Sequence, residues 1–281
     1  MSRSQAQLRH HFEVEKALAH RLRNAGREER RSLYTDCYNE LFACVPDHPQ
    51  LQLREAMDVR AAKALRQVRF LRSLIGEQAR FEFLEVGPGD CLISRTFADS
   101  YPQAQVSAVD VSDSITSLAA KSANMRVMIS DGCSVPVPAG SIDLVFSNQL
   151  MEHLHPEDAV EQLKNIFTAL RPGGRYFCIT PNRMSGPHDI SQHFVPVAVG
   201  FHLKEYTVGE LKALFETIGF VNCSSYIGLD GVYLRLPVGL IRLVEKVCSL
   251  VPQRWRMTFG KFAPVRLVLG IRLLAQKPPT A

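Results

Sequence analysis

A short glycine-containing turn at residues 85–90, EVGPGD, constrains this chain more than any other segment. An apolar run from Phe81 to Val86 precedes the turn, and a segment that can be helical follows Asp90. Such a strand, turn and helix start bring bare backbone close to a ligand, because glycine has no Cβ. The N–H groups at the start of the helix also point into the gap. The turn therefore predicts a site for a nucleotide-like cofactor.

From residue 81 onward, short apolar strands alternate with helical segments. Strands are expected at 81–86, 105–109, 126–130, 142–147, 174–180, 220–227 and 267–275. Helices are expected at 90–99, 113–122, 157–170 and 207–218. This alternation indicates βαβ units and a parallel sheet. The predicted fold class is α/β, with a doubly wound, seven-stranded, mostly parallel sheet.

The residues before the sheet carry apolar stripes at helical spacing. We therefore expect an N-terminal helical cap over residues 1–80 and a second domain over residues 81–281. A helical insertion at about 228–264 should precede the last strand. The cap either packs on the main domain or acts as a lid that lends Tyr34 or Tyr38 to a substrate pocket.

Charge is unevenly distributed along the 281 residues. Lys and Arg outnumber Asp and Glu by 15 to 10 before residue 81 and by 9 to 2 after residue 227, but the middle is acidic, with 9 against 16. An acidic middle argues against a nucleic-acid groove. No apolar run approaches the ~18–20 residues of a membrane span, and the N-terminus lacks a signal-peptide core. The seven scattered cysteines indicate reduced thiols without a zinc site. A cytoplasmic protein is expected.

Residues 232–274 combine Leu, Val and Ile with eight basic residues and the only tryptophan, Trp255. A basic amphipathic element of this kind can lie on an anionic membrane surface. Alternatively, the segment is a helical subdomain that covers the sheet or forms the face of a homodimer. The second interpretation is preferred from the sequence.

Acidic residues end the second and third expected strands. Asp110 follows Gly89 by 21 residues, which in a doubly wound sheet places a carboxylate beside the ribose of a nucleotide. Asp131 can accept from an exocyclic adenine amine, while the N–H of Gly132 serves a ring nitrogen. Each aspartate has a simpler alternative, because either can cap a helix or a turn.

These spacings, in this order, resemble the class I S-adenosylmethionine-dependent methyltransferases over about residues 81–227. The motifs are EVGPGD at 85–90, VD at 109–110, DG at 131–132, SIDLVFSNQLMEHL at 141–154 and LRPGGRYFCITPN at 170–182. A dinucleotide-binding turn would need glycine or alanine where this chain has Leu92, which argues against an NAD dehydrogenase. The N-terminal region resembles an extension found in some bacterial members.

The resemblance implies S-adenosyl-L-methionine as the cofactor and S-adenosyl-L-homocysteine as its product. It assigns Glu85, Gly87 and Gly89 to the methionine end of the cofactor, and Asp110 with Val111 to the ribose. It assigns Asp131 and Gly132 to the adenine, and Ser147 and Asn148 to the methyl group and the methionine amine. The family often has a third glycine where this chain has Cys91.

The predicted function is therefore enzymatic methyl transfer to a small-molecule acceptor, with a hydroxyl oxygen preferred and no nucleic acid or metal involved. In-line attack needs close positioning and exclusion of water, and a hydroxyl acceptor also benefits from a base. His153 and His193 rank first as that base. Two alternatives remain: a non-catalytic cofactor-binding regulatory or scaffold protein, and a membrane-surface methyltransferase with a lipid-linked substrate.

Overall fold

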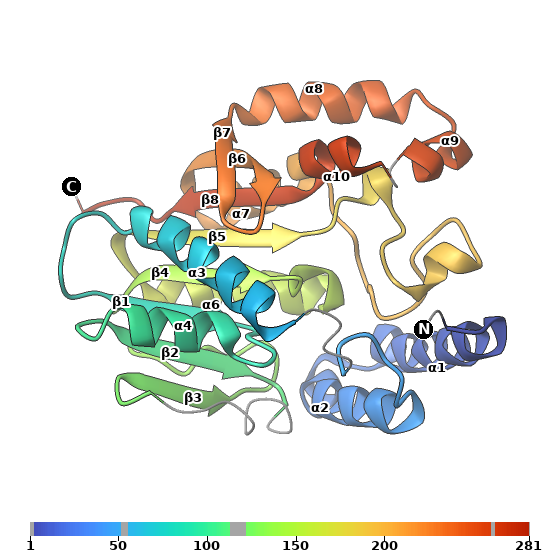
Figure 1. Ribbon diagram of the computed structural model, residues 1–281, viewed down its shortest axis with the longest axis horizontal. Helices are drawn as coiled ribbons and strands as arrows, with labels where there is room; N and C mark the ends of the chain where they lie inside the picture. Colours follow the sequence, from blue (N-terminus) through green and yellow to red (C-terminus); the bar gives the residue numbers. More distant parts are fainter. Residues whose placement is uncertain (1–2, 52–55, 113–121, 260–261, 281) are drawn as a thin grey trace.

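A computed structural model of the chain describes residues 3–51, 56–112, 122–259 and 262–280. Its centre is one sheet of eight strands in the order β3-β2-β1-β4-β5-β8-β6-β7, with helices on both faces (Figure 1). The strands are β1 (Glu82–Val86), β2 (Gln105–Asp110), β3 (Met125–Ile129), β4 (Ile142–Asn148), β5 (Leu170–Thr180), β6 (Val221–Leu229), β7 (Val232–Leu236) and β8 (Ile271–Gln276).

Strands β1 to β6 all run in one direction. Strand β8 lies antiparallel between β5 and β6, and β7 pairs antiparallel with β6 at the sheet edge. Strands β1 and β4 are parallel neighbours, and the order of the strands along the chain reverses between them. A reversal of this kind opens a crevice at the carboxyl ends of the strands, where ligands bind. The doubly wound α/β class predicted from the sequence is confirmed.

The predicted count of seven strands is wrong by one. Residues 232–236, expected in the helical insertion, form β7 because Asp230 and Gly231 make a tight hairpin turn with φ of 50° and 83°. Asp-Gly is a favoured pair for such a turn. The last strand begins at Ile271, not at 267, because the preceding residues are helical. The rest of the insertion consists of α8 (Val238–Ser249), α9 (Gln253–Phe259) and α10 (Ala263–Leu269).

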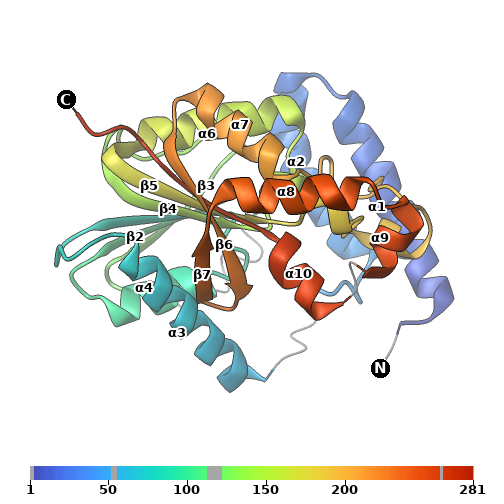
Figure 2. The same ribbon diagram turned by 90° about the horizontal axis from the view of Figure 1, so that it is seen from above.

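Helices cover both faces of the sheet (Figure 2). On one face, α3 packs on α4, and on the other α6 packs on α7. The stacked rings of Phe83 and Phe97, 4.2 Å apart, join β1 to α4. These helices are α3 (Met57–Ser73), α4 (Leu92–Ser100), α6 (Pro156–Ala169) and α7 (Val208–Ile218). The helix expected at 113–122 falls almost entirely outside the described residues.

The N-terminal helices divide between two places. Helices α1 (Gln5–Asn24) and α2 (Arg27–Cys44) pack on each other near the carboxyl ends of the strands (Figure 1). Buried Arg30 donates to Asp158 of α6 at 2.6 Å and ties α2 to the sheet domain. Helix α3, by contrast, belongs to the layer formed with α4. The domain boundary at residue 80 therefore stays a prediction. No described helix has both the length and the apolar character needed to cross a bilayer.

Candidate active site

A cavity of about 410 Å³ lies at the carboxyl ends of β1, β2 and β3. We call it the glycine-turn cavity. The turn after β1 forms one wall, and three aromatic residues of α2 form another. The lining includes Tyr34, Tyr38, Phe42, Glu85, Gly87, Gly89, Asp110, Val111, Gly132, Asn148, Gln149, His153 and Gln162. Tyr34 and Tyr38 thus line this cavity, and the lid interpretation of the N-terminal region stays a prediction.

The glycine turn is shaped to admit a ligand. Gly87 and Gly89 adopt φ of 70° and 54°, in the left-handed region that favours glycine. A Cβ on Gly89 would meet no atom within 4 Å, so the backbone there borders open space. Cys91 also has a left-handed φ of 56°, although it is buried and not glycine. Cys91 therefore has the left-handed backbone conformation that a third glycine at this position would adopt.

Asp110 is the last residue of β2, as expected, and its role toward a ribose stays a prediction. Its carboxylate accepts hydrogen bonds from the N–H groups of Val111 at 2.7 Å and Gly89 at 3.3 Å. Burial raises the pKa of Asp110, and the backbone N–H groups around it oppose that shift. The carboxylate thus holds the glycine turn against β2 and lines the cavity.

Asp131 lies apart from the cavity lining. It accepts from the N–H groups of Cys133 at 3.0 Å and Ser134 at 2.7 Å, and it lies 3.6 Å from Nη1 of Arg31. Burial opposes its ionisation, but these hydrogen bonds lower the pKa of Asp131 overall. The arrangement matches the turn-capping alternative. Gly132, the next residue, does line the cavity.

Gln162 of α6 reaches the same place, although no sequence motif marked it. Its Nε2 donates to the carbonyl oxygen of Gly132 at 2.6 Å. Its Oε1 is buried and has no hydrogen-bond partner among the described residues. A buried acceptor without a partner is costly, so this oxygen is suited to a donor on a bound ligand.

Glu85 and Ser147 are less accessible than expected. Glu85 lines the cavity, but its Oε2 accepts from the N–H of Ser94 at 3.0 Å and so anchors the start of α4. Burial raises the pKa of Glu85 to about 8. Ser147 is fully buried and hydrogen-bonds to the hydroxyl of Tyr176 at 2.7 Å, whereas Asn148 lines the cavity. Successive strand residues point to opposite faces, which separates these two.

The two candidate bases occupy very different surroundings. His153 lines the glycine-turn cavity, and its Nδ1 lies 3.0 Å from the carbonyl oxygen of Phe201, which only accepts, so Nδ1 carries the hydrogen. Burial lowers the pKa of His153 to about 3. His193 is exposed at the end of the short helix Ile190–His193 and lines neither this cavity nor the next.

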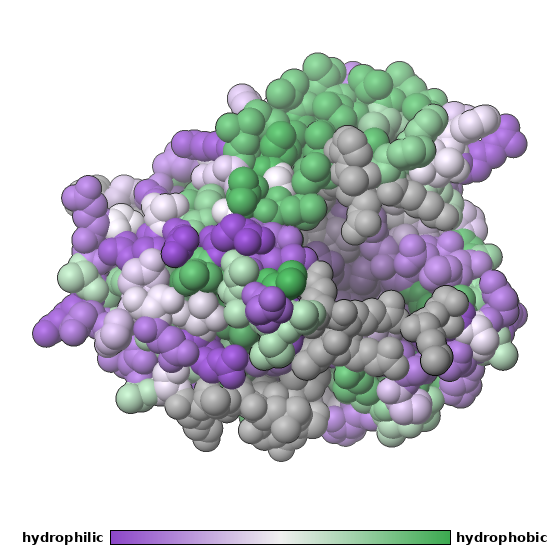
Figure 3. Space-filling model, in the orientation of Figure 1, coloured by the Kyte–Doolittle hydropathy of each residue, from purple (hydrophilic) through white to green (hydrophobic). Residues whose placement is uncertain are grey.

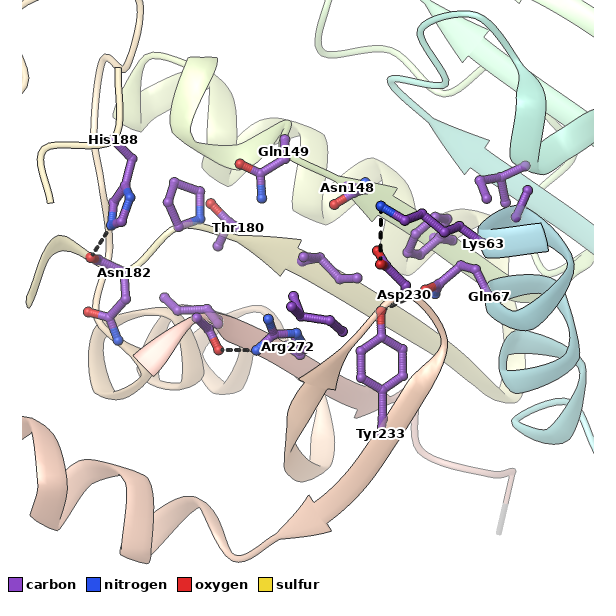
Figure 4. A pocket seen from close by; sticks show the side chains of 18 of the residues that line it. Lys63, Gln67, Asn148, Gln149, Thr180, Asn182, His188, Asp230, Tyr233 and Arg272 are labelled. Carbon is purple, nitrogen blue, oxygen red and sulfur yellow. Dashed lines mark hydrogen bonds and ion pairs between the residues drawn. The ribbon is translucent and has the colours of Figure 1, made fainter. Parts of the chain in front are cut away.

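A second cavity, of about 590 Å³, adjoins the first at the ends of β4, β5 and β8 (Figure 4). We call it the β4–β8 cavity. Residues distant in sequence form its walls: Arg60, Lys63 and Gln67 of α3, Thr180, Asn182, Ser185 and His188 after β5, and Leu229, Asp230, Tyr233, Gly270, Ile271 and Arg272. Five residues border both cavities: Arg60, Leu92, Ile93, Asn148 and Gln149.

Cations outnumber anions along the β4–β8 cavity. Lys63 faces Asp230, with Nζ and Oδ2 3.4 Å apart (Figure 4). Arg272 is buried and donates to the carbonyl oxygen of Gly270 at 3.0 Å. Arg60 pairs with Asp90 at the rim shared with the first cavity. No sequence motif marks this set of charged residues, because its members come from α3, the β6–β7 hairpin and β8.

The junction of the two cavities is conformationally unusual. Gln149, which follows β4, has a left-handed φ of 56° and donates from its N–H to Ile179 at 2.8 Å. Such backbone conformations in residues other than glycine cluster at functional sites.

Comparison with known proteins agrees with this geometry. Residues 83–174 match a family model described as a methyltransferase domain. The chain is 36% identical over 97 residues to a protein from Mycolicibacterium smegmatis described as a probable S-adenosylmethionine-dependent methyltransferase, covering 34% of this chain and 35% of that protein. It is 34% identical over 113 residues to the malonyl-[acyl-carrier protein] O-methyltransferase of Hahella chejuensis, covering 39% and 40%.

A solved structure shows the same fold. Phosphoethanolamine N-methyltransferase 2 of Haemonchus contortus, in complex with S-adenosyl-L-methionine, superposes with a TM-score of 0.54 at 14% identity, over 83% of this chain and 59% of that one. Residues 83–174 thus match a methyltransferase domain, and the sheet order and the glycine-turn cavity agree with the class I S-adenosylmethionine-dependent type. The chain spans well under half the length of the two curated relatives named above.

The glycine-turn cavity fits the cofactor of this family. Gly89 borders open space, as an approaching amino-acid group requires. Asp110 offers carboxylate oxygens to hydroxyl groups, and the unpartnered Oε1 of Gln162 offers an acceptor to an amine. The volume lies in the range of small-molecule sites. Gln162, which the sequence prediction did not include, lines this cavity, and Asp131 does not.

Proposed function

We propose that this protein is an enzyme that transfers a methyl group from S-adenosylmethionine to a hydroxyl oxygen of a small molecule. The observation that carries the proposal is the meeting of two cavities at Asn148 and Gln149. A cofactor in the glycine-turn cavity would present its reactive end to an acceptor in the β4–β8 cavity. Close positioning of two reactants supplies much of the rate enhancement that this chemistry needs.

The protein's own residues bind and orient the two ligands. When bound, S-adenosylmethionine supplies a methyl group already activated by the sulfonium. Asp110 accepts from ribose hydroxyls, and Gln162 accepts from the adenine amine through its Oε1. The open backbone at Gly89 receives the amino-acid end. The rings of Tyr38 and Phe42 of α2 keep water from the cavity, which strengthens electrostatic contacts inside it.

The lining of the β4–β8 cavity favours an acceptor that carries both hydroxyl groups and negative charge. The hydroxyl oxygens of Thr180 and Ser185 can still accept from hydroxyl groups, whereas the amide of Asn182 already donates to Glu245 and accepts from Met184. Lys63 and Arg272 supply positive charge for a carboxylate or phosphate on the same molecule. Nucleic acid stays a poor candidate because the middle of the chain is acidic.

We assign the proton-accepting role to His188. It is the histidine that lines the β4–β8 cavity, and its Nε2 lies 3.0 Å from the carbonyl oxygen of Asn182, which orients the ring. His153, with a pKa near 3, is a weak base. Replacing His188 with Gln should lower kcat at least tenfold with little change in KM for the cofactor. A pH–rate profile whose acidic limb is the same in the variant and the parent protein would contradict the assignment.

The cofactor site is tested by calorimetry with S-adenosylhomocysteine. Asp110→Ala should weaken binding by roughly 1–3 kcal/mol, the scale of a lost charged hydrogen bond. Asp131→Asn is the matched control and should bind normally, because Asp131 caps a turn outside the cavity. Equal affinities for Asp110→Ala and the parent protein would contradict the assignment of Asp110 to the ribose. Intact binding without turnover of labelled cofactor on any anionic hydroxy acceptor would favour the scaffold alternative.

A further inference from the structure

Exposed apolar side chains are concentrated on one part of this molecule. Of the 16 large hydrophobic residues that are exposed among the described residues, ten fall between positions 229 and 262. We call these ten the apolar face: Leu229, Val232, Leu234, Leu240, Leu243, Val247, Leu250, Trp255, Phe259 and Phe262. Figure 3 shows hydrophobic residues gathered over α8, α10 and the β6–β7 hairpin. Water-soluble monomers rarely leave a contiguous surface of this kind uncovered.

Helix α8 has more apolar surface than packing on the sheet domain requires. Val238 and Ile241 are buried against the protein. On the outside, Leu240, Leu243 and Val247 follow one another at the three- and four-residue spacing of a helix stripe, and each is about half exposed. A helix that merely covers a sheet needs one apolar side. The covering role preferred from the sequence therefore accounts for only one side of α8.

Positive charge surrounds the apolar face. Among the described residues of this segment, the exposed charged side chains are Arg235, Arg242, Lys246 and Arg254. Residues 228–281 contain only two acidic side chains. Asp230 pairs with Lys63, and Glu245 is buried, where it accepts from Asn182 and from the N–H of Val208. The carboxylates of this segment are thus already engaged, and cations dominate its outer surface.

We propose that the apolar face docks on an anionic lipid bilayer, with α8 lying in the plane of the surface. Apolar side chains, an exposed Trp and flanking Arg and Lys are the features of an interfacial helix. Each cation near an anionic surface adds to the attraction. A second copy of the chain is a poorer occupant, because a two-fold interface would bring the same cations together.

The docking surface is continuous with the β4–β8 cavity. Leu229 belongs to both, and Tyr233 and Gly270 line the cavity beside it. A molecule whose apolar part stays in the bilayer would then place an anionic, hydroxyl-bearing head group among Lys63 and Arg272. This assignment of an amphiphilic acceptor rests on the proposed function, whereas the docking does not.

Vesicle co-sedimentation tests the docking with the full chain. Vesicles of phosphatidylglycerol and phosphatidylcholine in equal parts should bind the protein, and vesicles of phosphatidylcholine alone should bind it much more weakly. Leu243→Ser with Val247→Ser should reduce the partition coefficient at least tenfold. Arg242→Gln with Lys246→Gln should reduce it roughly 10- to 30-fold, and 0.5 M salt should act in the same direction.

The matched control is Ile129→Ser, which removes an exposed apolar side chain at the opposite edge of the sheet. It should bind vesicles as the parent protein does, and thermal unfolding should show that all variants are folded. Absence of binding to the anionic vesicles overturns the proposal. The proposal is also overturned if vesicles do not bind and sedimentation velocity shows a dimer that the variant Leu243→Ser with Val247→Ser dissociates. Calorimetry with S-adenosylhomocysteine is a separate measurement, so failure of docking and failure of the proposed activity are distinguishable.

Discussion

Glu152 is a buried carboxyl group with an incomplete set of partners. Its Oε2 accepts from the hydroxyl of Thr180 at 2.8 Å, and its Oε1 has no hydrogen-bond partner among the described residues. Burial raises the pKa of Glu152 to about 8, as it does for Glu85. Both groups are therefore mainly protonated in the folded protein at neutral pH, but ionised in the unfolded chain.

This difference predicts how stability depends on pH. A folded-state pKa raised from about 4.5 to about 8 gives stability that is complete below pH 4.5 and is lost as the pH rises to 8. The lowered pKa of His153 affects stability only below about pH 6.5, because an unfolded histidine is mostly neutral above that pH. Between pH 6.5 and 8, the free energy of unfolding should therefore fall as pH rises.

Glu152→Gln should remove part of that fall. The neutral amide keeps an acceptor for Thr180 and cannot ionise, so the variant should gain stability relative to the parent protein toward pH 8. The slope should decrease by at most about 1.4 kcal/mol per pH unit, the value for one proton. Urea unfolding at three pH values measures it, with exposed Glu13→Gln as the control. Parallel curves for Glu152→Gln and the parent would refute the buried, protonated state.

At the scale of residues, the sequence predicted part of the site. Gly87, Gly89, Asp110 and Asn148 line the glycine-turn cavity because their places at strand ends bring them there. A strand end does not determine which way a side chain turns, so Asp131 and Ser147 were expected at the cavity but point elsewhere. Gln162, within α6, and Arg272, on β8, have no local pattern; only the tertiary fold brings them to the cavities.

At the scale of elements, the β6–β7 hairpin packs tightly against α3. Gly231 has φ of 83°, and a Cβ added there would lie 2.2 Å from the carbonyl carbon of Arg66. Gly231→Ala should therefore destabilise the protein by roughly 2 kcal/mol or more, through backbone strain and a clash with main-chain atoms. Denaturant unfolding measures the change.

Gly239, near the start of α8, provides the control for that substitution. A Cβ there meets no atom within 4 Å and the backbone is helical. Gly239→Ala should be neutral or stabilising by up to about 1 kcal/mol. If both variants lost the same stability, close packing of the hairpin on α3 would not be the cause.

Periodicity was sufficient to predict most elements. Strands β1, β2, β4 and β5 alternate with helices in the expected order because each is a short apolar run with polar ends. After residue 228 a helical insertion was predicted, which α8 and α9 confirm, but strand β7 was missed and the last strand was predicted to begin within α10. Short apolar runs do not by themselves distinguish strand from helix. The Asp-Gly pair at the hairpin was the usable signal, and it predicts β7.

At the scale of the whole molecule, two ligands should protect two different regions. The side chains of α2 form a wall of the glycine-turn cavity, so S-adenosylhomocysteine should slow amide hydrogen exchange in α2 and in the turn at 87–91. Anionic vesicles should slow exchange in α8 and leave α2 unchanged. Mass spectrometry of peptides from each region measures both effects. If S-adenosylhomocysteine protected α8 but not α2, the placement of the cofactor cavity would be wrong.

Helices α2 and α3, both outside the stretch that carries the recognisable motifs, supply walls to separate cavities. The part of the chain that matches the methyltransferase model, residues 83–174, therefore encloses neither cavity by itself. Two proteins with the same motifs but different residues at positions 60–67 and 229–233 would be expected to methylate different molecules. Relatives that share a substrate with this protein should thus be sought by similarity in those segments, and not by overall resemblance.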